Sequence, residues 1–154
     1  MADRADSPNG PETVETLLRL LSVLCRGLPA YLADARPWAH AGTGRIRTAL
    51  DHLVGDQQRY ARRVANAIVA RGGRPDPGCF SARFAAKNDL SLEFLLRDLL
   101  EDQRQAVATI ETCVADLHER GSVRFLAEEI LGNARGHLEI LEETARGPRG
   151  AVGE

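Results

Sequence analysis

Residues 72–90, GGRPDPGCFSARFAAKNDL, separate two long helix-forming segments and decide how the helices of this chain can be connected. The paired glycines suit the end of a helix, because glycine commonly follows the last helical residue. Residues 74–90 are rich in proline, glycine and small side chains and show no sustained apolar period. Roughly 18 residues can span about 55 Å when extended. A loop of this length is unusual in a compact domain unless it has to return along the molecule.

Apolar residues on both sides of this segment recur every three or four positions, which is typical of amphipathic helices. Four helices are predicted, and each start carries a suitable residue. Pro11 opens the first helix, Thr43 precedes the second, Ser91 begins the third, and Gly121-Ser122 turns the chain into the fourth. Pro29 falls near the end of the first helix and should kink it, because proline clashes with the carbonyl four residues earlier.

Short links join the first helix to the second and the third to the fourth, so each pair should be antiparallel. The long link then places the second and third helices parallel and side by side. We expect an all-α, ferritin-like four-helix bundle with a long crossover between helices two and three. The alternative is a simple up-down-up-down bundle with a loose middle loop. One domain should cover residues 11–146, with a disordered N-terminal tail over 1–10 and a C-terminal tail over 147–154.

Three polar side chains, Gln57, Gln103 and His137, interrupt the apolar faces of the last three helices. At 1.5 Å of rise per residue, the two glutamines lie about 18 Å below one end of a crossover bundle, and His137 about 20 Å below it. The three therefore predict a central polar layer. In a simple up-down bundle the two glutamines would separate, so this agreement favours the crossover.

The polar layer has three interpretations. The side chains can hydrogen-bond one another in the core, directly or through a water, since buried polar groups need partners. A single metal ion can bind His137, with Asp56 or Asp102 turned inward and Cys25 nearby. A small organic ligand can occupy the layer, in which case a cavity should be found there. A di-metal centre is not expected, because it needs about four carboxylates and two histidines.

Three stretches resemble the starvation-induced DNA-protection ferritins: RVANAIVARGGRP (63–75), LLRDLLEDQRQAVATI (95–110) and AEEILGNARGHLEILEE (127–143). They are similar to the end of helix two and to helices three and four of that family, and they cover about residues 45–145. The resemblance implies the ferritin-like fold, and it allows a homodimer through helices one and two.

The metal ligands of the family are mostly missing from this chain. His137 matches the histidine of the last-helix motif, but Ala134 stands where the glutamate of that motif should be. The resemblance therefore implies the scaffold and argues against inherited ferroxidase activity. We expect a non-catalytic protein without a cofactor that acts by binding an unknown protein partner. The alternatives are an iron- or manganese-binding protein that uses Asp56, Asp102, His137 and Cys25, and a small-molecule binder at the polar layer.

The overall composition limits other functions. The net charge is −2, and the arginines are scattered rather than clustered, so nucleic-acid binding is not expected. No uninterrupted apolar run reaches the roughly 18 residues of a membrane span, so no membrane association is expected. Cys25, Cys79 and Cys113 are odd in number and lack metal-type spacing, which predicts reduced thiols and a cytoplasmic protein. No role is assigned to Cys79 or to the Trp38–His40 link.

Overall fold

The computed structural model describes residues 10–38, 42–118 and 121–147, and every regular element within these ranges is a helix. The predicted all-α class is therefore confirmed. The predicted tails and His40 lie almost wholly outside the described residues. The elements are α1 (Pro11–Arg26), α2 (Leu28–Ala35), α3 (Gly44–Ala70), the short 3-10 helix η2 (Ala82–Lys87), α4 (Leu92–Asp116) and α5 (Ser122–Arg146).

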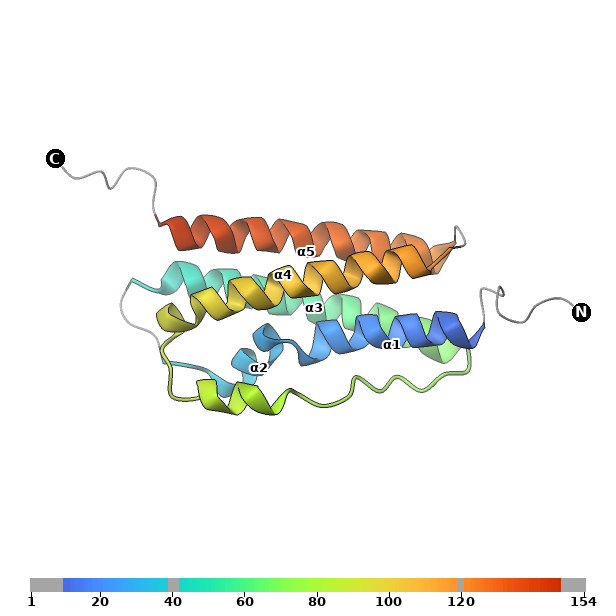
Figure 1. Cartoon of the computed structure of the whole chain (residues 1–154), viewed down its shortest axis with the longest axis horizontal. Coiled ribbons are helices and arrows are strands. Elements are labelled where there is room, and N and C mark those ends of the chain that lie inside the picture. The colour runs from blue at the N-terminus through green and yellow to red at the C-terminus, as the bar shows by residue number, and fades with distance from the viewer. Residues whose placement is uncertain (1–9, 39–41, 119–120, 148–154) are drawn as a thin grey trace, which may run out of the picture.

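The segment that joins α3 to α4, residues 71–91, runs back along the length of the molecule and is called the crossover segment below (Figure 1). As a result α3 and α4 run parallel to each other, whereas α1 and α5 run in the opposite direction (Figure 1). Both α1 and α5 pack against α3 and against α4. Helices α3 and α4 therefore lie diagonally across the bundle, and the expectation that they are side by side is wrong.

Leucine-rich faces from the long helices form the core. Leu17 of α1, Val64 of α3, Ile110 of α4 and Ile130 of α5 belong to one buried cluster, and each is at most 1% exposed. A second cluster lies towards the other end and joins α2 to α3 and α4. Phe84 of η2 belongs to this second cluster, so its ring attaches the crossover segment to the bundle.

The first helix of the bundle is broken rather than kinked. Gly27 is extended, with φ −75° and ψ 171°, and separates α1 from α2. Pro29, in the first turn of α2, has no N–H for the carbonyl of Cys25, and the Arg26 side chain donates to that carbonyl at 3.1 Å instead. The break places Leu28 and Leu32 in the second core cluster, each at most 1% exposed.

Residues 11–35, which comprise α1 and α2, are long and apolar enough by length and composition to cross a membrane. Of the 18-residue apolar window within this stretch, 44% is buried inside the bundle. The same composition is therefore used here to fill the core between α3 and α4. This finding qualifies the sequence expectation, which considered only uninterrupted apolar runs.

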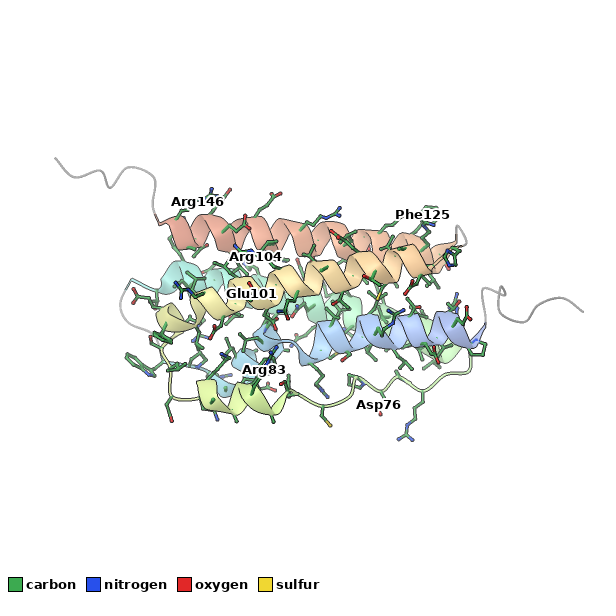
Figure 2. All side chains as sticks on the ribbon, in the orientation of Figure 1. Asp76, Arg83, Glu101, Arg104, Phe125 and Arg146 are labelled. Atoms are coloured by element: carbon green, nitrogen blue, oxygen red, sulfur yellow. The ribbon has the colours of Figure 1, made fainter. Side chains whose placement is uncertain are left out.

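Exposed ion pairs line the outer surface of α4 and α5. Arg104 of α4 lies 3.9 Å from Glu101 and 3.7 Å from Glu142 of α5, and Figure 2 shows Arg104 and Glu101 on the same stretch of α4. Arg135 and Glu111 form a similar pair at 2.9 Å. Exposed pairs of this kind contribute little stability, so the apolar clusters hold the helices together.

Candidate functional site

The seam between α3 and α5 contains a hydrogen-bonded group of four side chains that runs from the buried His137 to the exposed Arg59 and is called the Asp56 cluster below. His137 Nε2 lies 2.7 Å from Asp56 Oδ2, and Asn133 Nδ2 donates to the same oxygen at 2.8 Å. The Arg59 guanidinium pairs with the other oxygen, Oδ1. Both oxygens of the Asp56 carboxylate are therefore satisfied from within the chain, by donors from three different residues.

His137 is 7% exposed, so its protonation depends on its surroundings. Burial lowers the pKa of the imidazole, and the positive charges of His52 and Arg59 lower it further. The Asp56 carboxylate acts in the opposite direction, because it stabilises a proton on Nε2. In the neutral imidazole the Nε2–H donates to Asp56, and this leaves Nδ1 as the acceptor.

Gln103 reaches the same level from α4. Its Nε2 donates to the carbonyl oxygen of Ala134 at 3.0 Å, one turn before His137 on α5. The side chain is 1% exposed, and its Oε1 has no hydrogen-bond partner among the described residues. The structure therefore brings Gln103 to the level of His137, because Gln103 bonds to the α5 backbone one turn before that histidine.

Gln57, the third residue of the predicted polar layer, is 7% exposed, and its Oε1 also lacks a partner in the described part of the chain. Within residues 10–38, 42–118 and 121–147, no hydrogen bond joins Gln57, Gln103 and His137 to one another. In place of direct hydrogen bonds among the three side chains, the structure has two arrangements. Gln103 and His137 bond to α5 and to Asp56, whereas Gln57 lines a groove on another side of α3.

Two residues of the alternative metal set, Asp102 and Cys25, have other surroundings. Asp102 Oδ2 accepts the backbone N–H of Leu28 at 3.2 Å and so caps the start of α2. Burial raises the pKa of Asp102, although the Leu28 N–H and the charge of Arg83 act against this. Burial also raises the pKa of the Cys25 thiol, which keeps it protonated.

The alternative metal set is therefore only partly assembled. Asp56 and His137 are in contact, whereas Asp102 bonds to the N-terminus of α2. Among the residues that the structure describes, no three His, Cys, Asp or Glu side chains form a group that could hold a metal ion. Asn133 was not foreseen, although it lies one turn before His137 and this spacing places both on one helix face.

The groove beside Gln57 has a volume of about 420 Å³ and lies between the broken first helix and α3. Leu24, Val54 and Phe80 give it apolar walls, and Cys25 also lines it. Phe80 comes from the crossover segment, which covers one side of the groove. A volume of this size is in the range of small-molecule sites in proteins.

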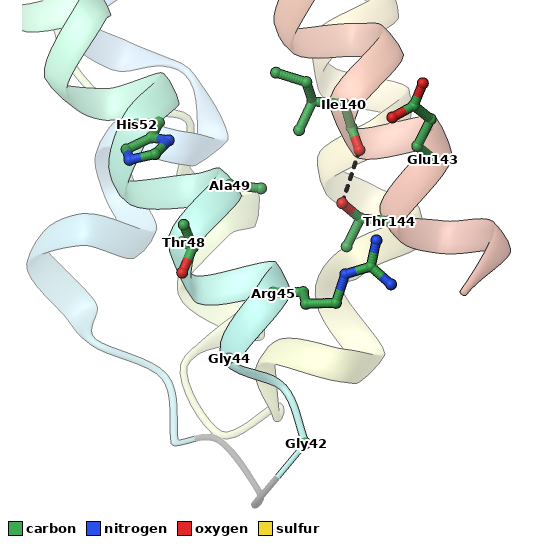
Figure 3. Close-up of a pocket in the computed structure, with 9 residues that line it drawn as sticks. All are labelled: Gly42, Gly44, Arg45, Thr48, Ala49, His52, Ile140, Glu143 and Thr144. Carbon is green, nitrogen blue, oxygen red and sulfur yellow. Dashed lines mark hydrogen bonds between the residues drawn. The ribbon is translucent and has the colours of Figure 1, made fainter. Parts of the chain in front are cut away.

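A second and wider hollow, of about 620 Å³, lies between the start of α3 and the end of α5 (Figure 3). Figure 3 shows Ala49 facing Ile140 across it, with Arg45 extending towards Thr144. The Thr144 hydroxyl donates to the Ile140 carbonyl at 2.7 Å. Arg45 and His52 are exposed to solvent, and this hollow contains no buried polar group that lacks a partner in the described chain.

No family model, curated protein or solved structure matches this chain.

Proposed function

We propose that this chain is a non-catalytic binding protein built on a ferritin-like four-helix bundle with a long crossover. The parallel course of α3 and α4, and the packing of α1 and α5 against both of them in the opposite direction, support this scaffold (Figure 1). The three sequence stretches that resemble DNA-protection ferritins fall on α3, α4 and α5.

The Asp56 cluster is the observation that carries the proposal. A di-metal bundle uses its central carboxylates and histidines as metal ligands. Here the carboxylate of Asp56 already accepts from Arg59, Asn133 and His137, and the guanidinium neutralises its charge. A cation would have to displace a positively charged group to reach it. The Asp56 cluster therefore serves to join α3 to α5, and we assign function to binding rather than to redox chemistry.

The remaining parts of the proposal follow from the sequence. We propose a cytoplasmic protein that binds neither nucleic acid nor membranes and forms a homodimer through the first two long segments of the bundle, α1–α2 and α3. The scattered arginines support the absence of nucleic-acid binding. The partly buried α1–α2 stretch supports the absence of membrane binding. Sedimentation velocity on the full chain tests the dimer.

Elemental analysis tests the absence of a metal function. Protein purified after growth with iron, manganese and zinc should contain well under one metal ion per chain, both in the wild type and in His137→Ala. One or two ions per chain in the wild type, lost in His137→Ala, would contradict the proposal. That result would favour the metal-binding alternative with Asp56, Asp102, His137 and Cys25.

A second test uses stability. Asp56→Ala should lower the free energy of unfolding by about 1–3 kcal/mol, because it leaves the buried His137 without the acceptor for its Nε2. Asp51→Ala is the matched control, since Asp51 is an exposed aspartate on the same helix and should change stability by less than about 0.5 kcal/mol. Urea unfolding measures both variants. Equal effects would show that the cluster does not join the helices.

A further inference from the structure

The outer face formed by α3 and α5, called the α3–α5 face below, presents apolar side chains to solvent. Ile140 of α5 is 45% exposed beside the wide hollow and faces Ala49 of α3 across it (Figure 3). Phe125, near the start of α5, is 62% exposed. Phe125 and Ile140 are 15 positions apart, and the helical repeat places them within about 60° of each other on α5. One side of α5 therefore carries two large apolar side chains that the chain itself does not cover.

The two helices of this face carry opposite charges. Arg45 and Arg62 are exposed on α3, and Glu139 and Glu143 are exposed on α5. Among the residues that the structure describes, none of these four side chains has an ion-pair partner. Arg45 and Glu143 line the same hollow, yet they form no ion pair across it. The face therefore has a basic side and an acidic side with charges that the fold leaves unpaired.

Contacts inside the chain show which residues of the two helices lie at one level. Asn133 of α5 donates to Asp56 of α3 at 2.8 Å, and the two helices are antiparallel (Figure 1). Arg45 lies 11 residues before Asp56, and Glu143 lies 10 residues after Asn133. Both are therefore about 15–17 Å from this contact, in the same direction along the bundle. The unpaired arginine and the unpaired glutamate lie at one level, at the open end of the face.

We propose that the α3–α5 face binds a second copy of this chain about a two-fold axis parallel to the helices. This axis places α3 of one copy on α5 of the other and keeps every residue at its own level. Arg45 of each copy then meets Glu143 of the other copy. The two hollows face each other, and the two Ile140 side chains fill the space between them.

The charges select this axis over the other two-fold arrangement of the same face. A two-fold interface uses the same patch on both copies, so the patch must be complementary to itself. An axis perpendicular to the helices would place α3 on α3 and α5 on α5. Arginines would then face arginines and glutamates would face glutamates, and such like-charge contacts are strongly unfavourable.

This contact goes beyond the homodimer of the proposed function and uses a different side of α3. The proposed homodimer combines α3 with α1–α2, whereas here α3 combines with α5. A closed assembly that contains two different two-fold contacts has at least four copies, and an assembly with one of them has two. The size of the particle therefore reports how many of the two contacts form.

Charge reversal followed by mixing tests the contact between Arg45 and Glu143. Arg45→Glu and Glu143→Arg should each raise the dissociation constant of this contact at least about tenfold at low salt, because each creates two repulsive pairs. An equimolar mixture of the two variants should return to within about threefold of the wild type, because every contact then joins opposite charges. Pairing inside one chain cannot produce this recovery. Sedimentation velocity on the full chain over a range of concentrations measures all three samples.

Arg97→Glu and Glu93→Arg are the matched controls for the charge reversals. Both residues are exposed on α4 and have no ion-pair partner in the described part of the chain, so these variants make the same changes of net charge away from the face. They should assemble as the wild type does.

A second pair of variants tests the apolar part of the contact. Ile140→Ser should raise the dissociation constant at least about fivefold at any salt concentration, because both copies lose a buried apolar side chain. Phe94→Ser is its control, since Phe94 is 67% exposed but lies on α4. That variant should leave the dissociation constant unchanged.

The outcomes separate this inference from the proposed homodimer. A wild-type tetramer that charge reversal converts to a dimer supports both contacts, and a dimer that charge reversal converts to a monomer supports the α3–α5 contact alone. A dimer that Arg45→Glu, Glu143→Arg and Ile140→Ser leave intact overturns this inference and leaves the homodimer of the proposed function. A wild type that is monomeric at about 0.1 mM overturns both. Failure of the mixture to recover also overturns the α3–α5 contact.

Discussion

His137 lies in the core because a single carboxylate, Asp56, accepts from its Nε2. The sequence identified His137 as buried from its position on an apolar helix face, and it placed Asp56 beside it only as a metal ligand. The role of Asn133 was not predicted. Which polar residues meet depends on how α3 and α5 are rotated about their axes, and a rotation of one residue position, about 100°, changes the partners.

Asp102 is a carboxylate whose burial costs stability at neutral pH. Burial raises its pKa from the ordinary value of 3.8, so the folded chain holds the proton more tightly than the unfolded chain. The tighter binding of this proton contributes stability that is fully present below pH 3.8 and is lost as the pH rises through the pKa of the folded state. Asp102→Asn cannot ionise and keeps an oxygen for the Leu28 N–H.

We therefore expect Asp102→Asn to become more stable relative to the wild type as the pH rises from about 4 to about 7. Urea unfolding at several pH values measures this difference. Asp51 is an exposed aspartate on α3, so the variant Asp51→Asn corrects for the general effect of removing a negative charge. A stability difference that stays constant with pH, or that shrinks as the pH rises, would contradict the assignment.

The helices themselves follow closely from local sequence. The predicted starts at Pro11, Thr43 and Ser91 agree with the observed caps and first residues, and Ser91 Oγ accepts the Phe94 N–H at 3.3 Å. The last helix is capped by Gly121 rather than by Ser122, which is its first residue. The sequence predicts only a kink at Pro29, whereas the structure has a break at Gly27, because the Asp102 carboxylate that caps α2 comes from a distant helix.

Substitution by alanine should change the stability of the protein in opposite directions at two glycines, one just after a helix and one inside a helix. At Gly73, just after α3, an added Cβ would lie 2.8 Å from Ile68 Cγ2 and 2.9 Å from Val14 Cγ1. Gly73→Ala should therefore lower the free energy of unfolding by about 1–3 kcal/mol, as overpacking does. At Gly132, inside α5, the added Cβ meets open space. Gly132→Ala should raise the free energy of unfolding by about 0.5–1 kcal/mol.

Denaturant titration of both variants measures these changes in a single experiment. Both variants add the same methyl group, and only the space around the added group differs. If Gly73→Ala is as stable as the wild type, the close approach of α1 to the end of α3 is not as tight as the structure has it. Destabilisation by Gly132→Ala would indicate that something covers this face of α5 in solution.

At the scale of the whole molecule, the crossover segment decides that α3 and α4 are parallel. Spin labels can test this in a chain whose three native cysteines are replaced. Arg45 and Phe94 are exposed residues near the starts of α3 and α4, and Ala115 is exposed near the end of α4. The distance between residues 45 and 115 should exceed the distance between residues 45 and 94. The difference can reach roughly 30 Å, which is the helical rise over the 21 residues from 94 to 115.

Pulsed dipolar spectroscopy on the two doubly labelled chains gives both distances. In the alternative up-down-up-down bundle α4 would run the other way, and the pair 45–115 would be the closer one. This outcome would remove the support for the ferritin-like scaffold. Circular dichroism of each labelled chain checks that the helices are retained.

The sequence by itself determined the helical class, most helix ends, the buried faces and the length of the crossover segment. These depend on apolar periodicity and on capping residues that are close together along the chain. Only the tertiary structure decided that Asp56 pairs with His137, that Asp102 caps α2, and that Gln57 faces a groove rather than the other polar residues. These contacts join residues more than 70 positions apart or depend on side-chain rotamers, and local sequence carries no information about either.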